Sequence, residues 1–374
     1  MRLEKLSLYN FKNYREAQLE FNGNIQCFLG KNGSGKTNLL DAIYYLSFTK
    51  SAINSSDQQA IRTGENHFLI KGELTKKAER HRVTCSFEEG QKKIIREDDE
   101  ECGKLSTHIG KYPVVLVAPN DIELIWDGSE MRRRFFDSLL SQTDKTYLEN
   151  LITYGRFLKQ RNSLLRIFLE RGTIDQDMLE VYDEKLVPAG EYIYRKRKDF
   201  MEEFLSLFDR YYRFLAGDEE KVQITYESQL HDVDFAQVLR QNLQRDILLQ
   251  RTGAGVHRDD FLFSINDGEL KRLGSQGQQK SFLIALKLAE FQVVFQNKGM
   301  KPLLLLDDIF DKLDDERIGK LMLLVVDGTF GQLLITDARA GRSLELLKES
   351  NVKAEFFQVE SGNLKRIHEK TQNR

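Results

Sequence analysis

The fold of this chain is decided by Gly30-Lys31-Asn32-Gly33-Ser34-Gly35-Lys36-Thr37, which fits the pattern G-x-x-x-x-G-K-[ST] at every fixed position. Glycines there let backbone N–H groups approach phosphate oxygens, while the lysine reaches the β- and γ-phosphates and the threonine hydroxyl can ligate Mg²⁺. Residues 25–29 read as a short buried strand, and apolar residues recur at helical spacing from 39 to 46. The helix N-terminus that this context predicts favours an anion, so we expect a nucleotide phosphate loop rather than an unliganded glycine-rich turn.

Composition is that of a globular protein with ample core. The 374 residues carry a formal net charge of -2, so any nucleic-acid surface must be a local patch. No apolar run approaches the roughly 20 residues that span a bilayer, and the N-terminus runs directly into a strand-like alternation. Cys27, Cys85 and Cys102 are far apart and in no metal-ligand spacing. We therefore expect reduced thiols, no membrane association and a cytoplasmic location.

Periodicity divides the chain into three parts. Residues 1–118 alternate as strands around the phosphate loop, and 119–251 form an inserted lobe that is helical from about 130 to 215. Residues 252–374 return to strands. The lobe helices are predicted to be too short and too aromatic for coiled-coil arms. The acidic run 97–101 is predicted to be a solvated loop, with a metal site as the alternative. The fold class is α/β.

A second acidic element completes the expected site. Four leucines, 303–306, form a predicted buried strand that ends in Asp307 and Asp308. Asp307 would hold Mg²⁺ together with Thr37, and Asp308 would polarise the attacking water as a general base. The alternative is a strand end with a solvated acidic turn, and the phosphate loop upstream favours the catalytic interpretation.

Residues 274–280 (Gly-Ser-Gln-Gly-Gln-Gln-Lys) open a predicted helix about thirty residues before this strand. Ser275 at a helix N-terminus is either a simple cap or part of an anion site. The segment resembles the ABC-type signature, usually Leu-Ser-Gly-Gly-Gln, which in that superfamily closes over the γ-phosphate held by a second subunit. Residues 311–314 resemble the superfamily's D-loop.

Together these motifs resemble the RecF family of bacterial recombination-mediator ATPases. The resemblance is carried by residues 8–14 (LYNFKNY), 30–45 (GKNGSGKTNLLDAIYY), 131–137 (MRRRFFD), 256–260 (VHRDD), 275–290 (SQGQQKSFLIALKLAE) and 303–314 (LLLLDDIFDKLD). It implies an ABC-type ATPase head of mixed sheet and helices, with an antiparallel β part and an inserted helical lobe that lacks a long coiled coil.

The resemblance also implies an activity. We expect ATP and Mg²⁺ to drive a head-to-tail homodimer on double-stranded and gapped DNA, slow DNA-stimulated hydrolysis to release it, and RecR and RecO to join it in loading the recombinase. The catalytic residues expected on this basis are Lys36, Asp307, Asp308 and Ser275. The nucleotide-binding residues are Gly30, Lys31, Asn32, Gly33, Ser34, Gly35, Lys36, Thr37, Asn38, Lys12, Asn13, Ser275, Gly277 and Gln278.

Two basic clusters in the lobe are candidate DNA contacts, because clustered Lys and Arg neutralise phosphates and release counterions. They contain Arg156, Lys159, Arg161, Arg195, Lys196, Arg197 and Lys198. Arg132–Arg134 could instead brace the lobe against the head through buried ion pairs, and His257 could either sense nucleotide across a dimer or sit in a structural network.

Three other classes of ATPase are considered. A transporter ATPase subunit would place a histidine after the next strand, where Thr336-Asp337 stands here. An SMC-like head would need hundreds of coiled-coil residues. A phage-defence ATPase would need a further acidic catalytic domain. The RecF-like interpretation fits the chain best.

Overall fold

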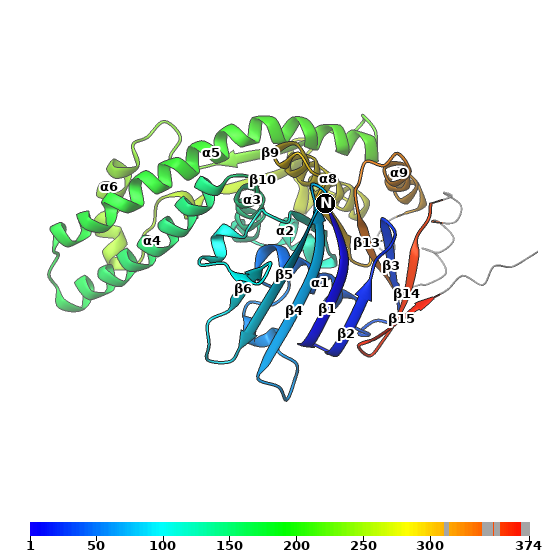
Figure 1. Ribbon diagram of the computed structural model, residues 1–374. Coiled ribbons are helices and arrows are strands. Elements are labelled where there is room, and N and C mark those ends of the chain that lie inside the picture. Colours follow the sequence, from blue (N-terminus) through cyan, green and yellow to red (C-terminus); the bar gives the residue numbers. More distant parts are fainter. Residues whose placement is uncertain (310–313, 339–346, 348–351, 368–374) are drawn as a thin grey trace, which may run out of the picture. The chain divides into compact units, whose positions relative to one another are not determined.

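The computed structural model describes residues 1–309, 314–338, 347 and 352–367 (Figure 1). Within the chain, two compact units can be distinguished. The first contains residues 1–121, 214–216 and 280–374, and the second contains 122–213 and 217–279. The predicted boundary at 118/119 lies close to this division. The third predicted part begins at residue 252, whereas the second unit continues to residue 279. The two differ because β10 (Asp260–Ile265) pairs along its length with β9 (Val222–Glu227) inside the second unit.

The first unit contains a six-stranded antiparallel sheet of order β2-β1-β4-β5-β6-β7. Alternation of apolar and polar residues in the sequence predicted most of these strands. Their bounds are β1 (Arg2–Phe11), β2 (Tyr14–Glu20), β4 (His67–Lys76), β5 (Glu79–Glu88), β6 (Ile94–Glu97) and β7 (Glu100–Glu101). The acidic run 97–101 is therefore not a loop throughout: β6 and β7 form a tight hairpin whose turn is Asp98-Asp99.

The second sheet of this unit positions the phosphate loop. Its order is β15-β14-β3-β13-β12-β8, with parallel pairing except between β14 and β15. The strands are β3 (Ile25–Leu29), β8 (Val114–Val117), β12 (Leu303–Leu306), β13 (Leu333–Asp337), β14 (Glu355–Glu360) and β15 (Asn363–Ile367). Because the carboxyl ends of parallel strands meet at one edge, the segments that follow β3 and β12 are brought to the same side.

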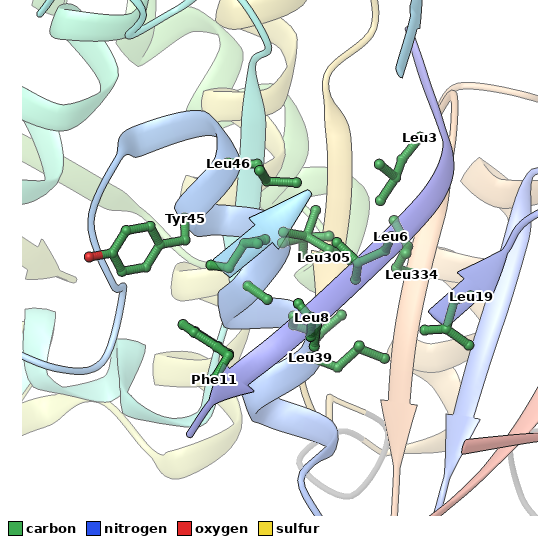
Figure 2. Close-up of a cluster of buried hydrophobic side chains, with 14 of the residues drawn as sticks. Leu3, Leu6, Leu8, Phe11, Leu19, Leu39, Tyr45, Leu46, Leu305 and Leu334 are labelled. Carbon is green, nitrogen blue, oxygen red and sulfur yellow. The ribbon is translucent and has the colours of Figure 1, made fainter. Parts of the chain in front are cut away.

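One apolar core joins the two sheets of the first unit through helix α1 (Lys36–Phe48). Leu6 and Leu8 of β1, Leu39 of α1 and Leu305 of β12 all belong to it (Figure 2). Strands β3 and β12 are buried on both faces. Strand β12 consequently reads as a continuous apolar run, and β3 does so apart from Gln26, whose buried amide donates to the Gly23 carbonyl at 2.7 Å. Helix α9 (Asp315–Val326) follows β12 in the chain.

The second unit is mainly helical. It contains α2 (Glu123–Trp126), α3 (Ser129–Thr143), α4 (Lys145–Arg171), most of α5 (Gln176–Ala216), α6 (Phe235–Leu249), α7 (Leu270–Leu273) and the start of α8 (Gln276–Lys298), beside the sheet β11-β10-β9 with β11 (Gly268–Glu269). The prediction of short helices is wrong for α5, which runs for 41 residues with Pro188 inside it. Its length is supported by packing, since an apolar stripe follows one face.

In the described residues, short 3-10 turns at 57–60, 105–107, 119–122 and 256–258 connect these elements. Among the described helices, none combines the length and the apolar character that crossing a membrane requires.

Candidate nucleotide-binding site

The phosphate loop lies between β3 and α1, and two of its glycines are required by their surroundings. A Cβ on Gly30 would lie 2.4 Å from the Val359 carbonyl oxygen, and one on Gly35 would lie 2.3 Å from the Asn13 side-chain nitrogen. Gly35 also has φ of 113°, in the left-handed region that disfavours side chains. The loop can therefore adopt this tightly packed backbone only with glycine at both positions, and a glycine-built backbone cradle of this kind is the geometry that phosphate groups need.

Lys36 begins α1 and is buried. Its ammonium donates to the Gly30 carbonyl at 2.8 Å and to the Lys31 carbonyl at 3.2 Å. These bonds fold the side chain back over the loop, so the positive charge lies within the cradle rather than in solvent. The predicted phosphate-binding role of Lys36 is consistent with this position.

The structure brings Thr37 and Asp307 together across 270 residues of sequence, as the two motifs predict. The Thr37 hydroxyl donates to Asp307 Oδ1 at 3.0 Å. Burial, and then the neighbouring charge of Asp308, raise the pKa of Asp307. A hydroxyl and a carboxylate in contact at the N-terminus of α1 form a hard oxygen donor set that suits Mg²⁺.

Thr336 is a site residue whose role the sequence interpretation missed. Its hydroxyl donates to Asp307 Oδ1 at 2.6 Å and accepts from the Asp308 backbone N–H at 2.9 Å. Asp308 has φ of 47°, so this bond helps to hold an uncommon backbone conformation. The sequence signal that could have indicated this role was the position of Thr336 near the end of the buried strand β13, which is parallel to β12.

Lys12, Asn13 and Asn38 gather around the loop but are engaged by the protein. The Asn13 amide donates to the Ser34 carbonyl at 3.1 Å, and Asn38 donates to Asn13 at 2.8 Å. The Lys12 ammonium lies 2.6 Å from the buried carboxylate of Asp41. The first two residues brace the loop, and direct nucleotide contact by any of the three stays a prediction.

The signature-like segment caps α8 reciprocally. The Ser275 N–H donates to Gln278 Oε1 at 2.7 Å, and the Gln278 N–H donates to Ser275 Oγ at 3.3 Å, which is a capping box. The capping interpretation is thus observed, while Ser275 remains exposed at the N-terminus of a 23-residue helix. Of the D-loop-like segment, 311–313 lie outside the described residues, and Asp314 accepts from the Arg317 N–H as the N-cap of α9.

Arg161, a predicted DNA contact, is a structural residue. Its side chain is fully buried and donates to Asp183 at 2.8 Å and to both Asp246 and Thr252 at 2.9 Å. The prediction is wrong because burial of an arginine requires compensating carboxylates, and these occupy its guanidinium.

Arg197 was also predicted to contact DNA, and it too is a structural residue, with only 2 % of its surface exposed. It donates to Asp137 at 2.8 Å, to Asp259 at 2.7 Å and to the Val256 carbonyl at 2.8 Å. By contrast Arg156, Lys159, Arg195 and Lys198 are exposed, and the Lys196 ammonium lies 3.2 Å from Asp144.

The bracing predicted for the basic motif is observed only in part, because Arg134 pairs with Glu130 on the exposed face of its own helix, whereas His257 lies in a structural network. Arg132 forms a two-bond ion pair with Asp260, at 2.8 and 2.9 Å, within the second unit. His257 Nε2 lies 3.0 Å from the Thr252 carbonyl and Nδ1 lies 2.7 Å from the Tyr154 hydroxyl. The carbonyl requires a proton on Nε2, so Nδ1 accepts from the tyrosine, and burial lowers the pKa of His257 to about 4.

Comparisons with known proteins place the whole chain in one family. Residues 2–361 match the family model described as the RecF/RecN/SMC N terminal domain. The chain is 45% identical over 359 residues to the DNA replication and repair protein RecF of Flavobacterium johnsoniae, which covers 96% of this chain and 100% of that one. It is 44% identical over 362 residues to RecF of Cytophaga hutchinsonii, covering 97% and 96%. A solved structure of the recombination mediator protein RecF-ATP in the RecFOR pathway matches with a TM-score of 0.88 at 28% identity, covering 98% of this chain and 97% of that one.

Proposed function

This chain belongs to the RecF family of DNA replication and repair proteins, and from that membership we propose that it is an ATP-driven, DNA-binding switch. The observation that carries the proposal is the 3.0 Å contact between the Thr37 hydroxyl and Asp307, beside a loop that only glycine can build. Transporter and defence ATPases, considered from the sequence, are set aside because relatives that match over nearly the whole chain are RecF proteins.

In the proposed mechanism the loop backbone N–H groups and Lys36 hold the phosphates of ATP. Thr37 and Asp307 would hold Mg²⁺, and the bound ion would supply positive charge that offsets the charge of the phosphates. Asp308 orients the attacking water and accepts its proton. Thr336 positions Asp308 through its backbone N–H, at 2.9 Å, and shares Asp307 with Thr37. The short aspartate side chain in the base position favours slow turnover, which suits a switch.

A head-to-tail homodimer completes the proposed site. Ser275 is exposed at the helix N-terminus of α8, where a hydroxyl, backbone N–H groups and the helix dipole together suit a γ-phosphate held by a second copy. The proposal assigns Gly277 and Gln278 to the same contact. ATP would then join two copies, and hydrolysis would release them.

DNA is the proposed ligand of the dimer, bound as duplex or gapped DNA through its phosphates. Arg156, Lys159, Arg195 and Lys198 remain candidates because they are exposed. The proposed role is to act in the cytoplasm with RecR- and RecO-type proteins in loading the recombinase, in keeping with the RecFOR pathway to which the solved RecF structure is assigned.

Light scattering coupled to size exclusion tests the switch directly. Wild type, Asp308→Asn and Ser275→Arg would be measured with and without ATP, Mg²⁺ and gapped DNA. We expect wild type to double its mass with ATP and retain DNA, Asp308→Asn to stay dimeric, and Ser275→Arg to bind ATP as a monomer. ATP binding with no change in the mass of wild type would refute the dimer switch, and a dimeric Ser275→Arg would remove the signature from it.

A further inference from the structure

A cluster of three potential metal ligands lies in the first unit, in the hairpin and turn that follow β5. Glu97 ends β6, Cys102 follows β7, and His108 follows the 3-10 turn at 105–107. One ligand atom from each residue lies within 4.8 Å of those of the other two. The Cys102 N–H donates to the Ile95 carbonyl at 2.8 Å, so the hairpin holds the thiol in register beside β6.

His108 has one ring nitrogen available as a ligand among the described residues. Its ring is fully buried, and Nε2 lies 2.6 Å from the Leu46 carbonyl in the last turn of α1. That carbonyl can only accept, so Nε2 carries the proton and Nδ1 keeps its lone pair. Nδ1 is buried and has no hydrogen-bond partner within the part of the chain that the structure describes. A metal-bound histidine commonly has this arrangement, with the second nitrogen fixed by a carbonyl.

The donor set is that of zinc. Thiolate, imidazole and carboxylate are the three ligand types that Zn²⁺ takes from proteins, and a site with three protein ligands leaves a fourth position for water. Tetrahedral zinc with ordinary bond lengths separates its ligand atoms by roughly 3.5 Å. Because the ligand atoms lie within 4.8 Å of one another, the cluster needs to contract by at most about 1.3 Å. Glu97 and Cys102 can move because both are only partly buried.

Two neighbours already hold the Glu97 carboxylate. The Tyr112 hydroxyl donates to Oε1 at 2.6 Å, and the Lys111 ammonium pairs with Oε2. The Lys111 side chain is 38% exposed, so it can swing into solvent. Its charge opposes a cation at this place, and it is the group that a metal must displace.

We propose that Glu97, Cys102 and His108 form a zinc-binding site that ties the β6–β7 hairpin to the C-terminal turn of α1. The helix that begins at the phosphate loop would then end against a metal-braced segment. The site is independent of the ATPase proposal, since none of its residues belongs to the nucleotide site.

Metal content is the direct test. The full-length chain would be stripped with a chelator, dialysed against buffered Zn²⁺ with a non-thiol reductant, and assayed by mass spectrometry for zinc per chain. Co²⁺ in place of Zn²⁺ would report the thiolate through its charge-transfer absorption. We expect one equivalent for wild type and for the control Cys85→Ala, whose thiol lies in the core of the antiparallel sheet.

Two variants move the affinity in opposite directions. Cys102→Ser should weaken zinc binding by more than about tenfold, since loss of even an outer-shell partner costs that much, and should abolish the cobalt charge-transfer band. Lys111→Met should bind zinc more tightly, because it frees Glu97 and removes a positive charge. No zinc on wild type at low-micromolar free Zn²⁺, or unchanged affinity in a Cys102→Ser chain with a native circular dichroism spectrum, would overturn the proposal.

Discussion

Replacement of Arg197 by methionine tests whether a buried charge network, rather than DNA, accounts for this residue. Methionine keeps much of the side-chain volume but removes the guanidinium. Arg197 bridges Asp137 on α3, at 2.8 Å, and Asp259 just before β10, at 2.7 Å. The substitution leaves both carboxylates without their cation.

The expected loss is about 3–5 kcal/mol in the free energy of unfolding, because removing one partner strands buried charge. Two features limit it. Each carboxylate keeps a tyrosine hydroxyl, from Tyr147 on Asp137 and from Tyr226 on Asp259. Burial also raises the pKa of Asp259, so this group can take up a proton more readily than an ordinary aspartate. The double variant Arg197→Met/Asp259→Asn should recover about 1 kcal/mol or more.

Urea unfolding followed by Trp126 fluorescence measures this loss, since the chain has a single tryptophan and it lies in the second unit with Arg197. The matched control is Lys198→Met, one residue along α5 and exposed, which should change the stability by less than about 0.5 kcal/mol. Folded Arg197→Met should keep the salt dependence of wild-type binding to gapped DNA. Equal stability of the two variants, with a shallower salt dependence for Arg197→Met than for wild type, would refute the structural role and restore a DNA contact.

Three further changes test the site and its surroundings. Gly35→Ala should weaken ATP binding more than tenfold in a titration, because its Cβ would meet the Asn13 amide at 2.3 Å. Gly33→Ala, which has open space around its Cβ, should weaken ATP binding less. Equal effects of the two substitutions would contradict the steric argument. Thr336→Val should leave ATP affinity near wild type and slow hydrolysis at least tenfold, through loss of its bond to Asp307, and unchanged turnover would remove it from the site. Burial lowers the pKa of His257 from 6.5 to about 4, so the unfolded chain binds an additional proton between these values and stability should fall as the pH falls from about 6.5 to about 4. His257→Gln should flatten that decline in urea midpoints, and a parallel decline in both chains would show that other groups cause it.

Local sequence was sufficient for the phosphate loop and for most strands of the first unit. The glycines of the phosphate loop, the leucine run before Asp307 and the alternation of β1, β4 and β5 each depend on neighbours within a few residues. A required backbone conformation selects glycine, and burial of a strand selects apolar residues, so both can be recognised from a short stretch of sequence. The contact between Thr37 and Asp307 could also be inferred, because parallel strands of one sheet bring their carboxyl ends together.

Tertiary structure decided which charged residues are solvated. Arg195, Lys196, Arg197 and Lys198 form one basic run, yet only Arg197 is buried, on the stripe that continues to Phe204. That helical spacing was a signal in the sequence, but its cause, the carboxylates of Asp137 and Asp259, comes from segments some 60 residues away on either side. A charge is buried only when distant partners offset its desolvation, so no local pattern can determine it. The role of Thr336 likewise depends on a neighbouring strand, because its partners Asp307 and Asp308 follow β12.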